Sequence, residues 1–236
     1  GRLLSCDFAN TTFDWENMLE DYESKKDYTE VQGNAVATLM AAVGVSVDMQ
    51  YTESGSGAMS REARYGLINY FCYNENINWL NRSFYSAAEW MKYIYTELNQ
   101  NRPIYYTGDD ERNGGHAFVL DGYDKQGMVH INWGWGGYQD GYFDLTILQP
   151  TKGGAGSGSA VDGYNRDCSM IIGIAPDNGK VDEPLASYPQ IMSINQNAQC
   201  GITWTKTTRA RVSENFQAKA TTCFANQSTT DFNGYF

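Results

Sequence analysis

The chain has 236 residues, 42% of them hydrophobic, which is enough to bury a full core in one domain and part of another. Its formal net charge of −11 argues against nucleic acid and anionic membranes as partners, because both select basic surfaces. No apolar run approaches the ~20 residues that span a bilayer. Two histidines and five cysteines without a CxxC pair do not suggest a zinc site. We therefore expect no metal and no cofactor.

Two amphipathic helical patterns come first along the chain. The first covers residues 30–43, with Gly44 as its expected end and a strand-like alternation over 45–49 behind it. A loop of small residues at 54–58 leads into the second helix. Each pattern places its apolar residues on one face, namely Val36, Leu39, Met40 and Val43 in the first helix and Ala63, Leu67, Ile68 and Phe71, a predicted core face, in the second.

A third helix and a series of strands follow. Ser86 to Glu89 is a capping-box signature, with Trp90, Ile94 and Leu98 at helical spacing after it and Arg102-Pro103 as the stop. From there the pattern changes to strands separated by Gly-rich turns, expected at 103–107, 116–123, 128–133, 142–148 and 169–175. Helices first and an antiparallel sheet second predict an α+β fold.

The segment from Pro176 to Lys180 has the composition of a domain boundary. The sequence beyond it is rich in Asn, Thr and Ser, with strand-like runs at 201–205 and 216–220. We therefore predict one domain over 1–176, followed by a linker and the front portion of an accessory β-sandwich over 177–236.

One histidine stands in a distinctive setting. His116 follows Gly115 at the start of a β-branched and aromatic strand, and a tight turn and a return strand then lead to Asn132, Trp133 and Trp135. A His ring held by an amide and sheltered by indole rings is the base-and-orienter half of a cysteine peptidase site. We expect the Asn132 amide within hydrogen-bonding reach of one nitrogen of a partly exposed His116 ring.

Several motifs occur in a fixed order along the chain. They are Leu39-Met40, Gly44 to Met49, Ser56 to Ala58, Arg102 to Gly108, Gly114 to Tyr123, His130 to Gly137, Asp140 to Phe143 and Ile171 to Pro176. Together they resemble the streptopain family of secreted bacterial cysteine peptidases, which are papain-like in fold. The likeness covers about residues 1 to 176.

The resemblance implies a role for each site residue. His116 would be the general base and Asn132 the amide that orients its ring, with Trp133 packed over that amide. Substrate backbone would meet a cleft lined by Ser56, Gly57, Gly115 and Trp135. The resemblance also implies polypeptide substrates and a bacterial protein that is secreted or held at the cell surface or in the periplasm, virulence-associated and proteolytically processed.

The nucleophile of that family is not found in this sequence. The family's catalytic Cys stands in a Gly-x-Cys-Val-Ala-Thr motif, and residues 33–38 match it only with Ala35 in the place of Cys. The residues that follow match a later part of the family pattern, so we expect the nucleophile on an upstream Cys-bearing segment or propeptide of the same precursor. Cys72, next to Phe71 at a helix end, is expected to be a packing residue and not the nucleophile, and Cys6 has no helix behind it to activate its thiol.

Two functions follow from this departure. The first is a cysteine endopeptidase whose His/Asn half lies on this chain, which alone would be inactive. The alternative is a catalytically inactive papain-like homologue that acts as a binding protein. In either case a domain without the nucleophile helix should expose an apolar groove.

Overall fold

The computed structural model describes residues 4–22, 27–53, 55–146 and 163–178, together with the backbone of four short strands between residues 191 and 226. The chain divides into two compact units, Gly1–Leu185 and Ala186–Phe236. The first unit holds every residue predicted to form the site.

Among its described residues, the first unit has three α-helices and two short 3-10 helices: η1 (Trp15–Asn17), α1 (Glu30–Ser46), α2 (Ser60–Tyr70), η2 (Arg82–Phe84) and α3 (Ala87–Asn99). Thr29 and Gln32 form a capping box at the start of α1, and Ser86 and Glu89 form another at the start of α3. The capping box predicted at Ser86 is confirmed.

A six-stranded antiparallel sheet forms the second half of this unit. Its strands are β3 (Asn78–Asn81), β4 (Ile104–Asp110), β5 (Gly114–Tyr123), β6 (Val129–Asn132), β7 (Gly141–Phe143) and β8 (Arg166–Ile172), in the spatial order β3-β8-β4-β5-β6-β7. A separate hairpin pairs β1 (Gln50–Thr52) with β2 (Gly55–Gly57). Helices and an antiparallel sheet together confirm the predicted α+β fold.

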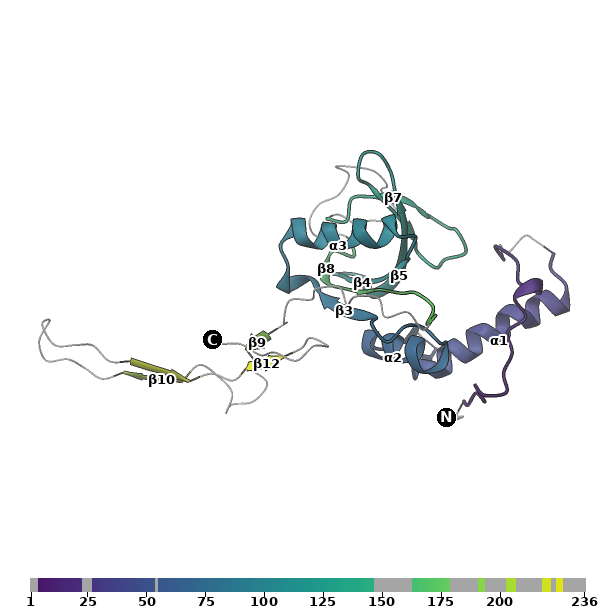
Figure 1. Ribbon diagram of the computed structural model, residues 1–236, viewed down its shortest axis with the longest axis horizontal. Helices are drawn as coiled ribbons and strands as arrows, with labels where there is room; N and C mark the ends of the chain where they lie inside the picture. The colour runs from purple at the N-terminus through teal and green to yellow at the C-terminus, as the bar shows by residue number, and fades with distance from the viewer. Residues whose placement is uncertain are drawn as a thin grey trace, which may run out of the picture. The chain divides into compact units, whose positions relative to one another are not determined.

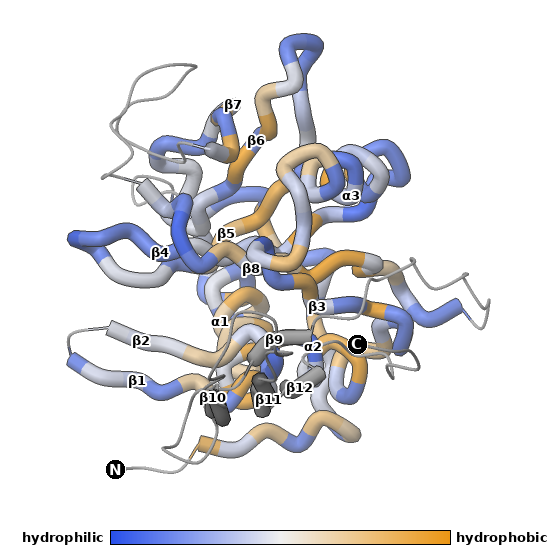
Figure 2. The backbone as a smooth tube through the Cα atoms, turned by 90° about the vertical axis from the view of Figure 1, so that its left-hand side faces the viewer, coloured by the Kyte–Doolittle hydropathy of each residue, from blue (hydrophilic) through white to orange (hydrophobic). Residues whose placement is uncertain are grey.

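The core lies between this sheet and α3, which covers one of its faces (Figure 1). Trp90 and Ile94 of α3 belong to the same buried cluster as Ile131 of β6, and each of the three is at most 2% exposed. The Trp90 indole donates a hydrogen bond of 3.1 Å to the Tyr106 hydroxyl inside this core. β6 and part of β5 stand out as hydrophobic in Figure 2. Burying each such side chain contributes roughly 1.5–3 kcal/mol to folding, so the core fixes the strands that carry His116.

The C-terminal end of α1 differs from the prediction. The helix continues through Gly44 to Ser46, and the strand expected at 45–49 is wrong, since β1 begins only at Gln50. Close packing explains the glycine: a Cβ at position 44 would lie 2.0 Å from the Tyr51 hydroxyl oxygen. Gly44 therefore admits a neighbouring side chain and does not end the helix.

The apolar face predicted for α1 is not part of the core. Met40 is 67% exposed and Val43 is 41% exposed, whereas the residues of α1 that are buried are Ala35, Ala42, Gly44 and Ser46. Figure 1 shows α1 running outward from α2, on the side of the sheet opposite α3. Within the described part of the chain, no element covers the Met40 side of α1.

Two strands end well before their predicted ranges do. The strand predicted at 142–148 ends at Phe143, because the Asp144 carboxylate accepts a hydrogen bond of 2.8 Å from the Thr146 amide and forms a turn; residues 147–148 lie outside the described residues. β8 ends at Ile172, before Gly173 with its φ of +74°, and so the range 169–175 ran too far. β3 had not been predicted.

In the second unit, the four described strands form two small antiparallel sheets. One pairs β10 (Thr203–Lys206) with β11 (Ala218–Thr221), and the other pairs β9 (Ile191–Ser193) with β12 (Phe224–Asn226). β10 and β11 overlap the strand-like runs expected at 201–205 and 216–220. That 177–236 is a linker and part of an accessory β-sandwich stays a prediction. Among the described residues, no helix is both long and apolar enough to cross a membrane.

Candidate active site

His116 lies on β5 and its imidazole is half-buried. Its Nε2 is 2.9 Å from the backbone carbonyl oxygen of Trp133. A carbonyl can only accept a hydrogen bond, so in the neutral ring Nε2 carries the proton and Nδ1 holds the free lone pair. The geometry therefore makes Nδ1 the basic nitrogen of this histidine.

Four aromatic rings surround the His116 imidazole. The ring centroids lie 5.1 Å away for Trp135, 5.4 Å for Tyr164, 6.2 Å for Phe118 and 6.3 Å for Trp133. The Trp133 side chain is fully buried, and its indole stacks against that of Trp135 at 5.6 Å. These rings restrict the orientation of the imidazole and shield one side of it from water.

The hydrogen bond expected between Asn132 and His116 is not made. The Asn132 side-chain oxygen instead accepts a hydrogen bond of 2.8 Å from the Gly134 amide, and no hydrogen bond joins Asn132 to His116 among the described side chains. The strand register explains this, since Asn132 pairs with Val119, three positions from His116. The Trp133 carbonyl takes the orienting position that was predicted for the amide.

Two residues that support this arrangement were not among the predicted site residues. Asp140 accepts a hydrogen bond of 2.9 Å from the Trp133 amide, and this bond helps to fix the backbone of Trp133, whose carbonyl holds His116. Tyr164 is 7% exposed and contacts the imidazole from a distant part of the sequence. The role of Asp140 depends on a bond to a backbone amide, and the role of Tyr164 depends on a contact with a residue far away in the sequence. Neither role leaves a motif, so neither could be predicted from the sequence.

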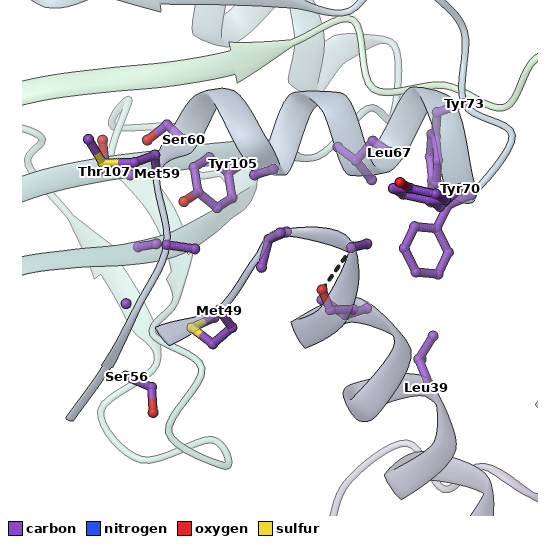
Figure 3. Close-up of a pocket in the computed structure, with 18 of the residues that line it drawn as sticks. Leu39, Met49, Ser56, Met59, Ser60, Leu67, Tyr70, Tyr73, Tyr105 and Thr107 are labelled. Carbon is purple, nitrogen blue, oxygen red and sulfur yellow. Dashed lines mark hydrogen bonds between the residues drawn. The ribbon is translucent and has the colours of Figure 1, made fainter. Parts of the chain in front are cut away.

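A large groove opens beside His116, with a volume of about 1160 Å³. Leu39 of α1, together with Leu67 and Tyr70 of α2, lies on its helical side, and Tyr105 and Thr107 of β4 lie on the sheet side (Figure 3). Most lining residues are apolar, and Asp109 is the one carboxylate among the described residues that line it. The apolar groove that we expected is present.

The groove brings together most of the predicted site residues. His116, Gly115, Ser56 and Gly57 all line it. Trp135 does not line it but contacts the His116 ring from beside the groove. The roles assigned to these residues in binding substrate stay predictions.

No described cysteine is hydrogen-bonded to the His116 ring. Cys6 contacts the Thr11 hydroxyl at 3.6 Å, and Cys168 is buried, which raises the pKa of its thiol. Cys72 lines the groove and is exposed, so it is not the buried packing residue that we expected. Cys200 and Cys223 lie outside the described residues. Among the described side chains, no cluster of three or more His, Cys, Asp or Glu could hold a metal ion.

Known proteins share this sequence and fold. A profile of the peptidase C10 family matches residues 1–143. Streptopain of Streptococcus pyogenes is 42% identical over 173 residues, which are 73% of this chain and 42% of that protein. The thiol protease/hemagglutinin PrtT of Porphyromonas gingivalis is 39% identical over 165 residues, which are 70% of this chain and 18% of that protein.

A solved structure supports the same relationship. Active wild-type interpain A, a cysteine protease of Prevotella intermedia, superposes with a TM-score of 0.60 at 36% identity, over 69% of this chain and 64% of that one. The chain spans less than half the length of the streptopain relatives that it matches. It belongs to the peptidase C10 family, the streptopain-like cysteine peptidases of papain-like fold.

Proposed function

We propose that this chain carries the His116 half of the catalytic site of a secreted, streptopain-like cysteine endopeptidase. The nucleophilic Cys belongs to a segment outside these residues, which docks in the groove beside the imidazole. The proposal depends chiefly on one observation: a half-buried imidazole, fixed by the Trp133 carbonyl, lies on the wall of an apolar groove.

The proposed chemistry begins with a proton transfer. A thiol with the ordinary pKa of ~8.5 is mostly protonated at neutral pH, so it needs a nearby base or positive charge to become a thiolate. Nδ1 of His116 would accept the thiol proton, because Nε2 already donates its own proton to Trp133. The resulting imidazolium would stabilise the thiolate, and the surrounding aromatic rings would strengthen this ion pair by excluding water.

The thiolate sulfur would then attack the scissile carbonyl carbon of a polypeptide. The imidazolium would return its proton to the leaving amine, and water would hydrolyse the resulting thioester with His116 again as the base. Asn132 would act in this scheme by shaping the turn that presents the Trp133 carbonyl, through its bond to the Gly134 amide. The orienting role predicted for its amide thus becomes indirect.

The size of the groove fits the docked segment. A groove of about 1160 Å³ offers room for a helical segment that packs against α1 and α2. The lining is apolar on the α1 and α2 side, as a packed helix requires. Substrate would pass the exposed Ser56, Gly57 and Gly115, where little side-chain bulk hinders the approach of a peptide backbone.

Reconstitution tests this proposal. We expect the 236-residue chain alone to leave casein intact, and co-expression with the Cys-bearing segment of its precursor to give inhibitor-sensitive hydrolysis. His116→Ala should then lower kcat/KM by about a thousandfold or more, because the thiol loses its base. His130→Ala is the matched control, since that imidazole pairs with Asp121 at 2.5 Å and does not line the groove.

Two outcomes would contradict the proposal. Inhibitor-sensitive proteolysis by the isolated chain would mean that the nucleophile lies within these 236 residues. A stable complex with the segment that binds peptides but does not cleave them would instead support the binding-protein alternative.

A further inference from the structure

The carboxylate of Asp110 joins two segments that lie far apart in the sequence. Asp110 is the last residue of β4 and is 6% exposed. Its Oδ1 accepts hydrogen bonds from the Arg112 amide at 2.9 Å, the Asn113 amide at 2.8 Å and the Asn113 side chain at 2.9 Å. Its Oδ2 accepts a bond of 2.6 Å from the Gly163 amide. One oxygen therefore shapes the β4–β5 turn, and the other fastens residue 163 to it.

The residue after Gly163 is part of the His116 site. The Tyr164 ring lies 5.4 Å from the imidazole and 5.6 Å from the Trp133 indole. It packs on two of the groups that define the orientation of the base. The bond from Asp110 to Gly163 thus ends one residue from a direct neighbour of His116.

The backbone of Tyr164 packs directly against strand β4, and this contact limits how far Tyr164 can move. A Cβ on Gly108 would lie 2.1 Å from the Tyr164 carbonyl oxygen, so the two backbones are in direct contact. Gly108 is also the cross-strand partner of His116 in the β4–β5 register. A displacement of Tyr164 would therefore reach His116 through its ring and through this strand pair.

We propose that Asp110 is a positioning residue for His116, acting through Gly163 and Tyr164. It holds the Tyr164 ring against the imidazole and so maintains the geometry in which Nε2 donates to the Trp133 carbonyl. Its effect on catalysis rests on the proposed function, but its effect on the orientation of the ring does not.

The two oxygens of Asp110 allow a selective variant. In Asp110→Asn the side-chain oxygen can still accept from the turn, whereas the NH₂ group that replaces Oδ2 cannot accept from Gly163. Asn113→Ala is the matched control, because it removes one donor from the turn and leaves the Gly163 bond in place. Tyr164→Leu removes the aromatic ring and leaves Asp110 unchanged.

The NMR signals of the two imidazoles in the 236-residue chain provide the readout. Protein labelled with [13Cε1]histidine is compared at pH 9, well above the ordinary histidine pKa of ~6.5, so that the shifts report ring surroundings and not protonation. We expect Asp110→Asn and Tyr164→Leu each to move the His116 signal, which is assigned by its loss in His116→Gln. Asn113→Ala should leave that signal in place, and the His130 signal should not move in any of these variants.

The double variant separates positioning from a direct charge effect. If Asp110 acts through Tyr164, the combination of Asp110→Asn with Tyr164→Leu should move the His116 signal no further than Tyr164→Leu alone. Additive shifts would overturn the proposal, since they would mean that the lost charge acts directly. An unmoved His116 signal in Asp110→Asn, or an equal shift in Asn113→Ala, would overturn it as well.

One measurement needs no variant. Hydrogen exchange of the Gly163 amide in the wild-type protein should be slow, because that N–H is bonded to a buried carboxylate. Exchange at the rate of a free amide would overturn the proposal even if Asp110→Asn does not fold.

Activity adds the functional consequence. In the reconstituted peptidase, Asp110→Asn should lower kcat on the order of tenfold with little change in KM, since displacing a catalytic group by about 1 Å can cost a hundredfold. Asn113→Ala should keep the wild-type kcat. If the chain is no peptidase, this comparison gives no signal in any variant, whereas the NMR shifts still decide the role of Asp110.

Discussion

The two sides of the groove are built differently. On the sheet side, β4, β5 and β6 pack against α3, and Ile131 and Trp133 are fully buried. On the helical side, α1 leaves Met40 67% exposed and Val43 41% exposed. The sheet side thus has its packing partner within the described residues, and the Met40 and Val43 side of α1 does not. In the proposed function, the docked segment would add a surface on the helical side, and the histidine side would need no rearrangement.

The sequence of α1 fits that interpretation. Its apolar residues are not limited to the one face predicted from the sequence, since Val31 and Val45 lie outside that face. A helix that is apolar on most sides is normally buried in a core. The composition of α1 is therefore that of an interior helix, and it supports a docked partner.

A pair of truncations tests whether the two sides differ in stability. Ile131→Ala removes a fully buried side chain and should lower the free energy of unfolding by about 2–5 kcal/mol. Met40→Ala removes a mostly exposed side chain and should change it by no more than about 0.5 kcal/mol. Urea denaturation of both variants measures the difference. Equal losses would show that α1 is already packed within this chain.

A pair of charge substitutions on α1 tests where the partner docks. Val43→Asp places a carboxylate in the groove lining and should weaken binding of the Cys-bearing segment by roughly ten- to a hundredfold, because the charge would be buried without a partner. Ala41→Asp carries the same charge on the same helix, at an exposed position outside the lining and on the opposite side from Val43. Titration calorimetry with the segment compares them. A loss that is larger for Ala41→Asp would move the docking surface away from the groove.

On the sheet side, the hydrogen bonds to the Asp110 carboxylate should make a small contribution to stability that is lost in acid. Burial alone would raise the pKa of Asp110, but hydrogen bonds from Gly163, Arg112 and Asn113 outweigh it and hold the pKa below its ordinary value. Because the folded pKa is the lower one, this contribution to stability is complete above the unfolded pKa of ~3.9 and is lost as the pH falls through the folded pKa. The excess Tm of wild type over Asp110→Asn should therefore be constant from pH 7 to 5 and shrink below about pH 4. An excess that grows on acidification would contradict this sign.

The elements with local signals could be predicted from the sequence. α3 was expected from the capping box at Ser86 and from Trp90, Ile94 and Leu98, and all three of these apolar residues are buried. Such caps depend on residues a few positions apart, so the chain alone contains the information. The antiparallel strands around His116 were found for the same reason, from alternation and turn residues.

The features that failed depend on contacts between distant residues. Gly44 resembled a helix stop, but its role is set by Tyr51, which packs against it. Asn132 resembled the partner of His116, yet the register of β5 and β6 places it opposite Val119. A shift near Leu120 and Gly122 interrupts that register, and nothing in the sequence reveals it. The importance of the Trp133 carbonyl could not be predicted, because every residue has one.

The identity of the reactive cysteine decides whether the nucleophile lies on a docked segment, as proposed, or on this chain. The reconstituted protein would be treated with a thiol-directed peptide inhibitor, and the labelled residue would be located by mass spectrometry of its fragments. We expect a label on the cysteine of the docked segment, with labelling strongly slowed in His116→Ala because the thiolate loses its partner. A label on Cys6, Cys72 or Cys168 that removes the activity would contradict it.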